Sequence, residues 1–427
     1  MSHSAHATII EQQNDIYYGT EVLNRVSFLR EDPDFITDSV GHASARFIFY
    51  ENTNPLVNSQ LDDKLVLLTN GDNQLEGPQV CKKGLQNLQQ WTQVVETWAE
   101  ANKNHDASMR APERPTFLFL GLQDESVGLD LKSLKAADDG ESEHYLDHQG
   151  RYQGIPYYAV DVTNAPTVRD LVVDFYNSEI NNNNQSAADN DVIFTAHRKH
   201  HIGFTNTEAS LFSHGRMFLD WLARNRFCPG CGSKVIPVHA GGKLKCTNSE
   251  ASECPVQSAT VSNVSFPRTD AVIITAITNT DRTKVLLSLA KRHAHTNMYA
   301  CTAGFMEPSE TVEIATKREI WEETGVVCKK INVVLTQPWP FPGNLMIGCI
   351  GEVEFDGESE VVNLGHDREL SDARWFDIEF VRKLIYKNEV KDGEDFNPEN
   401  ILLPFPESIA HSLIKLAVDQ AGNKGKL

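Results

Sequence analysis

The sequence has 427 residues, 40% of them hydrophobic and 23% charged, with a formal net charge of −20 at pH 7. This length allows two or three domains of ordinary globular composition. The acidic balance argues against a protein that coats nucleic acid through a basic surface, although it allows a local site for a nucleotide or an RNA end. No apolar run of about 18 residues and no basic-then-apolar start is present, so we expect neither a membrane span nor a secretory signal.

The first 200 residues predict a mixed α/β domain. Short apolar runs bounded by polar, Gly or Pro residues predict strands at 46–50, 64–69, 116–122 and 157–162. A helix is predicted over 207–224, with Thr207 as its N-cap, because its apolar residues recur on one face. No catalytic signature accompanies these elements, so we expect this region, taken as 1–225, to be a scaffold.

Four of the eight cysteines fall in one short stretch, as Cys228, Cys231, Cys246 and Cys254. The Cys-Pro-Gly-Cys turn brings two thiolates together, and two more follow at a wider spacing. Four thiolates suit tetrahedral Zn²⁺ in a small structural module, which we place at 226–262. A redox-active Cys-x-x-Cys pair is the alternative, but no thioredoxin-like strand–helix context surrounds it.

The last part of the chain, taken as 263–427, predicts strands at 271–277, 284–290, 333–335 and 346–354. Helices are predicted at 379–387 and 408–420. Between the strands lies the segment GFMEPSETVEIATKREIWEETGV, residues 304–326. Here Gly304 is expected to open a loop that needs a permissive backbone.

A short acidic helix is the most informative feature of this segment. Thr311 can cap its start and Gly325 its end. Glu319, Glu322 and Glu323 fall within little more than one turn, where they repel one another unless cations neutralise them. Oxygen ligands grouped in this way suit Mg²⁺ or Mn²⁺. The ordinary alternative is a solvated acidic helix surface.

The whole segment resembles the Nudix box, G-x5-E-x7-R-E-U-x-E-E-x-G-U, in which U is aliphatic. The resemblance implies an α/β/α sandwich in which Glu319, Glu322 and Glu323 bind the metal and Arg318 orients a glutamate. It gives Glu310 a supporting role. It also suggests Glu352, in the predicted strand at 346–354, as a more distant metal ligand.

A second motif, Gln-Pro-Trp-Pro-Phe-Pro at 337–342, cannot form a helix or a central strand, because its prolines lack backbone donors. Its aromatic rings, Trp339 and Phe341, can form a rim for a flat ligand ring; buried rings in a stiff loop are the alternative. With the four cysteines and the Ser-Ile-Ala element at 408–410, the motif resembles the NADH pyrophosphatase subfamily of Nudix hydrolases. By this resemblance the remaining substrate contacts are expected from Phe266, Phe305, Asn344, Met346 and Ala410.

The resemblance implies metal-dependent hydrolysis of NADH or NAD to nicotinamide mononucleotide and AMP, with removal of NAD caps from RNA as a further activity. It implies a homodimer, and a peroxisomal or cytoplasmic location, since the terminal Gly-Lys-Leu approximates a peroxisomal signal. Two other readings remain open: a Nudix pyrophosphatase for ADP-ribose or other nucleoside diphosphate compounds, and a zinc-ribbon adaptor for RNA or protein with a degenerate Nudix domain.

Overall fold

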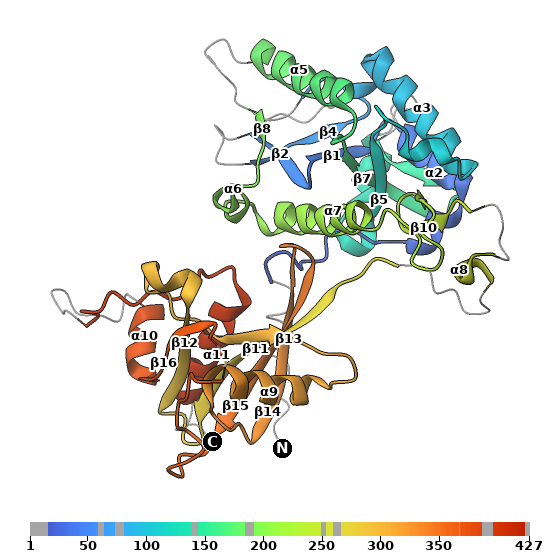
Figure 1. The fold of residues 1–427 in the computed structure, drawn as a ribbon. Helices are drawn as coiled ribbons and strands as arrows, with labels where there is room; N and C mark the ends of the chain where they lie inside the picture. Colours follow the sequence, from blue (N-terminus) through green and yellow to red (C-terminus); the bar gives the residue numbers. More distant parts are fainter. Residues whose placement is uncertain are drawn as a thin grey trace. The chain divides into compact units, whose positions relative to one another are not determined.

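The computed structural model describes residues 16–58, 64–72, 81–137, 144–183, 192–248, 253–258, 266–366, 368–386 and 396–422. These residues divide into two compact units, one holding 20–268 and the other holding 16–19 with 269–422 (Figure 1). The second unit is therefore built from both ends of the chain. Within the described residues no helix is both long and apolar enough to cross a membrane. The terminal Gly-Lys-Leu lies outside them.

The unit of residues 20–268 is an α/β domain around a mixed sheet with the strand order β3-β2-β1-β7-β5. Its strands are β1 (Arg46–Glu51), β2 (Asn54–Asn58), β3 (Lys64–Leu65), β4 (Leu67–Thr69), β5 (Thr116–Gln123), β6 (Leu146–His148), β7 (Tyr152–Asp161) and β8 (Val192–Phe194). Its helices are α2 (Pro33–Gly41), α3 (Gln89–Lys103), α4 (Leu131–Ala137), α5 (Pro166–Asn183), α6 (Arg198–Ile202) and α7 (Asn206–Arg224). The predicted strands at 46–50, 116–122 and 157–162 and the predicted helix are confirmed. The strand predicted at 64–69 is divided into β3, which pairs with β2, and β4, which pairs with β1.

Helices cover both faces of this sheet because the strand side chains alternate between two buried faces. Phe47 and Phe49 of β1 pack with α3, as in their ring contacts to Trp91, whereas Tyr50 stacks on Phe212 of α7. The predicted N-cap of α7 was wrong. Thr205 caps the helix, because Glu208 completes a capping box with it that Thr207 cannot form.

The cysteine-containing segment forms a hairpin of β9 (Val235–Val238) and β10 (Lys243–Cys246), followed by α8 (Pro255–Ser258). The turn of the hairpin is hydrogen-bonded to helix α3 and strand β5 of the same unit. The amide of Ala240 donates to Asn102 Oδ1 at 3.1 Å, and its carbonyl accepts from the amide of Phe119, in edge strand β5, at 3.0 Å. The hairpin thus extends the α/β domain. The predicted boundaries at 226, 262 and 263 stay predictions.

The other unit has a six-stranded sheet with the order β14-β15-β11-β12-β16, and β13 pairs with β11. Its strands are β11 (Asp270–Asn279), β12 (Lys284–Ala290), β13 (Thr302–Phe305), β14 (Lys330–Trp339), β15 (Asn344–Val353) and β16 (Leu370–Asp377). Its helices are α9 (Val312–Thr324), α10 (Ile378–Ile385) and α11 (Ile409–Gly422). Every strand and helix predicted for this region is confirmed.

Two apolar clusters, one on each face of the sheet, make this unit an α/β/α sandwich. Ile320 of α9 packs with Ile277 and Val353 on one face, while Leu413 of α11 packs with Ile350 on the other. The predicted fold class is confirmed. Strand β14 runs further than predicted and takes in the first half of the proline-rich motif. An edge position makes this possible, since Pro338 needs no donor on the open side.

Candidate active site

Helix α9 presents one buried face and one acidic face. Thr311 caps its start by accepting from the amide of Ile314, and Gly325 ends it with a left-handed φ of 74°. Thr316 and Ile320 are fully buried against the sheet. The helix and both caps are confirmed as predicted, and this packing fixes where the glutamates stand.

Arg318 is the centre of the acidic face. Its Nε and Nη2 donate to both oxygens of Glu310, at 2.7 and 2.8 Å. Its Nη1 donates to Glu319 at 2.8 Å and to Glu322 at 2.9 Å. Its Nη2 also donates to the backbone carbonyl of Phe305 at 2.9 Å. One guanidinium therefore holds three carboxylates and the end of strand β13 in a fixed arrangement.

The surroundings of Glu310, Glu319 and Arg318 shift their pKa values in different directions. Bonds from Arg318 lower the pKa of Glu310 to about 2, and the carboxylates in turn raise the pKa of Arg318 above its ordinary value. Burial raises the pKa of Glu319, against the pull of Arg318. Glu310 therefore stays an anion that anchors Arg318, while Glu319 is a partly desolvated carboxylate that gains from a further positive charge.

Gly304 makes room for Glu319. A Cβ atom at Gly304 would lie 2.0 Å from the carboxyl carbon of Glu319 and 2.2 and 2.3 Å from its two oxygens. Gly304 lies in strand β13 rather than in an opening loop, so the predicted reason for this glycine was wrong. The absent side chain, rather than backbone freedom, brings the Glu319 carboxylate against the strand.

Two further glutamates were predicted as ligands. Glu323 is buried, with 6% of its surface exposed. Glu352 forms ion pairs with Arg282 at 3.5 Å and Lys330 at 3.4 Å. Because side chains alternate along β15, Glu352 lies on the α11 face with Ile350, away from α9. The role of Glu323 stays a prediction, and the geometry gives the role of Glu352 no support.

The predicted ring-binding residues fall into two groups. Trp339 and Phe341 are half-buried and contact each other edge-on, with ring centroids 5.8 Å apart. Phe305 is 58% exposed, and its carbonyl accepts from Arg318. Because side chains alternate along β13, its ring lies on the same face of the strand as Ala303, which packs in the cluster of the α11 face, and not on the side of Glu319. Phe266 is 52% exposed and belongs to the other unit.

The remaining predicted contacts lie around the sheet and α11. In the pairing of β14 with β15, Asn344 lies opposite Trp339 and Met346 lies opposite Gln337. Ala410 is buried in α11, where its carbonyl accepts from the thiol of Cys301 at 3.6 Å. The structure therefore groups Asn344 and Met346 with the proline-rich motif. Their contacts to a substrate stay predictions.

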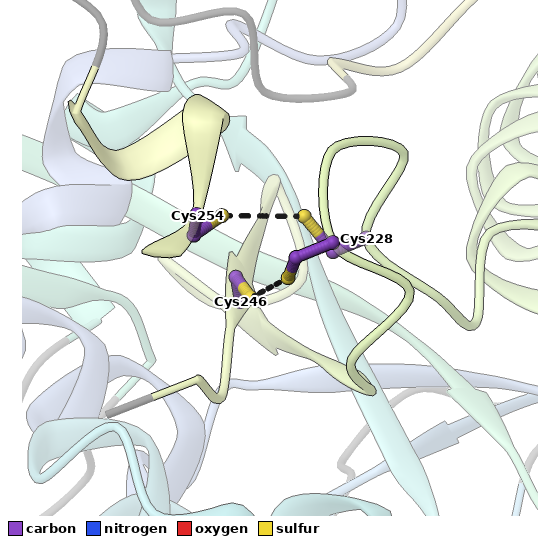
Figure 2. A group of neighbouring side chains, drawn as sticks. Cys228, Cys246 and Cys254 are labelled. Carbon is purple, nitrogen blue, oxygen red and sulfur yellow. Dashed lines mark hydrogen bonds between the residues drawn. The ribbon is translucent and has the colours of Figure 1, made fainter. Parts of the chain in front are cut away.

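The four cysteines form a second site (Figure 2). The sulfur atoms of Cys228 and Cys254 are 3.7 Å apart, and those of Cys231 and Cys246 are 3.5 Å apart. An S–S bond of about 2.05 Å is excluded at these distances, whereas Zn–S bonds of about 2.3 Å in a tetrahedron place sulfurs about 3.8 Å apart. Hydrogen bonds from Ser233 lower the pKa of Cys231 to about 6, whereas burial raises the pKa of Cys246 to about 12.

Among the described residues, the cysteines are the one group of three or more possible metal ligands whose atoms all lie within 4.8 Å of one another. This geometry fits zinc. The carboxylates of the Arg318 cluster are different in kind, because they offer hard oxygen atoms, the type of ligand that Mg²⁺ and Mn²⁺ prefer.

The six-stranded sheet with the acidic helix α9 on one face matches a known protein family. The NUDIX domain model matches residues 267–394, which contain strands β11–β16, α9 and the Arg318 cluster. The chain belongs to the Nudix hydrolases, enzymes that use divalent metal ions.

Comparison with individual relatives, two of them matched over nearly their full length, narrows the assignment within this family. The chain is 37% identical over 416 residues to NAD-capped RNA hydrolase NPY1 of Saccharomyces cerevisiae, covering 96% of this chain and 97% of that protein. It is 30% identical over 404 residues to an NAD-capped RNA hydrolase of Schizosaccharomyces pombe, covering 93% and 92%. The human NAD-capped RNA hydrolase NUDT12 is 36% identical over 213 residues, covering 49% and 41%. Within the Nudix hydrolases, the chain is of the NADH pyrophosphatase type.

Proposed function

We propose that this enzyme hydrolyses the diphosphate bond of NADH or NAD to nicotinamide mononucleotide and AMP, and that it removes NAD caps from RNA by the same cleavage. The observation that carries the proposal is the Arg318 cluster, which fixes Glu310, Glu319 and Glu322 on one face of α9 and binds the backbone carbonyl of Phe305. The names of the full-length relatives support the substrate.

The residues present fit a divalent cation. Glu319 and Glu322 share one nitrogen of Arg318, so their oxygens lie on the same side of the helix, and Gly304 leaves space for one of them. We propose Mg²⁺ or Mn²⁺ at Glu319, Glu322 and Glu323. A cation bound there would neutralise diphosphate charge and lower the pKa of a bound water.

The chain's own groups position the reaction. Arg318 holds Glu319 and Glu322 on one side of the helix, and Glu310, whose pKa is lowered to about 2, keeps Arg318 in place. Positioning of this kind supplies most of the acceleration in phosphoryl transfer. Phe305, Trp339 and Phe341 offer aromatic surface for the flat rings of a dinucleotide.

The cleavage is the same for the free dinucleotide and for capped RNA, whose AMP half belongs to the transcript. The net charge of −20 disfavours tight RNA binding, so we rank the free dinucleotide first. Zinc at the four cysteines would join the Cys228–Cys231 turn, the end of β10 and the start of α8, as the spacing of the sulfur atoms supports.

A homodimer and a peroxisomal location complete the proposal. Their support is the subfamily resemblance and, for the location, the terminal Gly-Lys-Leu. Light scattering of the purified protein tests the first, and imaging of a fluorescent fusion with and without the last three residues tests the second.

Product analysis tests the function itself. Purified enzyme is incubated with Mg²⁺ or Mn²⁺ and NADH, NAD, ADP-ribose or NAD-capped RNA. We expect nicotinamide mononucleotide and AMP in equal amounts from NADH, and 5′-monophosphate RNA from the capped transcript. Hydrolysis of ADP-ribose with NADH left intact would contradict the proposal.

A further inference from the structure

Residues 16–19, here called the N-terminal strap, lie against the proline-rich motif more than 300 positions later in the sequence. Both belong to the same compact unit. Ile16 packs into the apolar cluster of the α11 face, and a Cβ at Gly19 would lie 3.0 Å from Cδ of Pro338. The strap is thus in close contact with the motif.

The side chain of Gln337 ties the strap to the motif. Its Nε2 donates to the carbonyl of Tyr17 at 2.9 Å and to that of Glu407 at 2.8 Å, while its Oε1 accepts from the amide of Ile409 at 2.8 Å. Gln337 is 1% exposed. A buried amide with all these bonds made is rigid, so strand β14, the strap and the start of α11 hold one arrangement.

Tyr18 completes a group of three aromatic rings. Its centroid is 5.8 Å from that of Trp339 and 6.1 Å from that of Phe341, with interplanar angles of 87° and 78°. Trp339 and Phe341 are 5.8 Å apart at 71°. Each pair has the edge-to-face geometry that aromatic rings prefer, so each ring restricts the rotation of the other two.

The backbone of Tyr18 is held in an unfavourable conformation. Its φ is 69°, in the left-handed region that a large side chain rarely adopts, and the amide of Gly19 closes the turn by donating to the carbonyl of Ile16 at 2.9 Å. Such backbone strain persists only where the surroundings impose it, and it clusters at ligand sites. Here it turns the Tyr18 ring onto Trp339 and Phe341.

We infer that the N-terminal strap is a positioning element of the nucleotide-ring site, in which Tyr18 sets the orientation of Trp339 and Phe341 for a flat ring of the substrate. Tyr18 is 5% exposed, so it acts through these two rings rather than on the substrate itself. The inference rests on the proposed function and adds the strap to the residues that decide substrate affinity.

The test compares Tyr18→Ala with Tyr18→Phe, which keeps the ring. For Tyr18→Ala we expect a KM for NADH raised about tenfold with kcat within about twofold, because ring contacts are lost while the α9 glutamates are untouched. Tyr18→Phe should behave as wild type. The same rise should appear in the Kd for NADH measured without divalent cations.

Two further measurements keep the outcome decisive. Gly19→Ala, which pushes the strap from Pro338, should raise KM in the same direction if Tyr18→Ala fails to fold. A crystal structure of Tyr18→Ala should show the Trp339 or Phe341 ring turned, a readout that needs no substrate. Unchanged rings, an unchanged Kd, or equal impairment of Tyr18→Phe would overturn the inference. Wild-type enzyme that leaves NADH intact would instead overturn the proposed function.

Discussion

Replacing Gly304 with alanine adds one methyl group beside Glu319 and so tests the arrangement of the carboxylates that we propose as metal ligands. The added Cβ would meet the carboxyl carbon of Glu319 at 2.0 Å, and ordinary contact begins at 3.4 Å. The three nearest atoms all belong to Glu319, so this side chain has to move by more than 1 Å while the strand stays in place.

Such a displacement removes the Glu319 contact with Arg318 and shifts a proposed metal ligand. A misplacement of about 1 Å costs on the order of 100-fold in rate, or about 2.7 kcal/mol. We expect kcat/KM for NADH to fall by about this factor, with a higher metal concentration needed for half-maximal rate. Thermal unfolding should change little, because β13 is extended and alanine fits its backbone.

Steady-state hydrolysis of NADH, followed by AMP release, measures the effect. Gly41→Ala is the matched control, since no atom lies within 4 Å of its added methyl group. In a Glu319→Ala background, Gly304→Ala should cost nothing further, because the two changes act on one contact. Wild-type activity of Gly304→Ala would contradict this prediction. The same fold-loss of kcat/KM from Gly304→Ala in the Glu319→Ala background as in the wild type would also contradict it.

Three further outcomes are expected. Glu323→Gln should leave the fold intact and lower kcat for NADH by orders of magnitude. Glu313 is an exposed carboxylate of the same helix, so the control Glu313→Gln should keep the wild-type kcat. Equal kcat values for the two variants would show that Glu323 is not a metal ligand. Metal analysis should find one zinc per chain, and Cys228→Ser should lose it and lower the melting temperature by several degrees, at about 2–4 °C per kcal/mol. Burial lowers the pKa of His201 to about 4 and that of His214 well below its ordinary value, so both stay neutral when folded. In the unfolded chain both histidines bind a proton near pH 6.5. The free energy of unfolding is therefore highest above that pH and falls towards pH 4, by about 3 kcal/mol for His201 alone. Equal free energies of unfolding in urea at pH 7 and pH 4 would contradict this.

The local elements of both units could be predicted because their signals are local. The caps Thr311 and Gly325, and the alternation of apolar residues in strands, each depend on a few neighbouring positions. The cap of α7 was misplaced by two residues, since Thr205 and Thr207 are equivalent by residue type. The decisive difference is that Glu208 lies three positions after Thr205.

Contacts between distant segments could not be predicted from spacing. The clearance of Gly304 for Glu319 needs the pairing of β13 with β11, and the position of Glu352 on the α11 face needs the strand register. The strap carries no motif at all, and only the fold brings Tyr18 to Trp339. A signal was present in Gln337, whose amide could be expected to bond buried backbone, but its partners could not be named.

We propose above all that the glutamates of α9 hold divalent cations against the diphosphate of a dinucleotide. A crystal grown with Mn²⁺ and a non-hydrolysable NAD analogue tests it most directly through the anomalous signal of manganese. We predict manganese within about 2.2 Å of oxygens from Glu319 and Glu323 and of a diphosphate oxygen. Manganese bound elsewhere, with these carboxylates still held by Arg318 and the analogue's diphosphate distant, would contradict it.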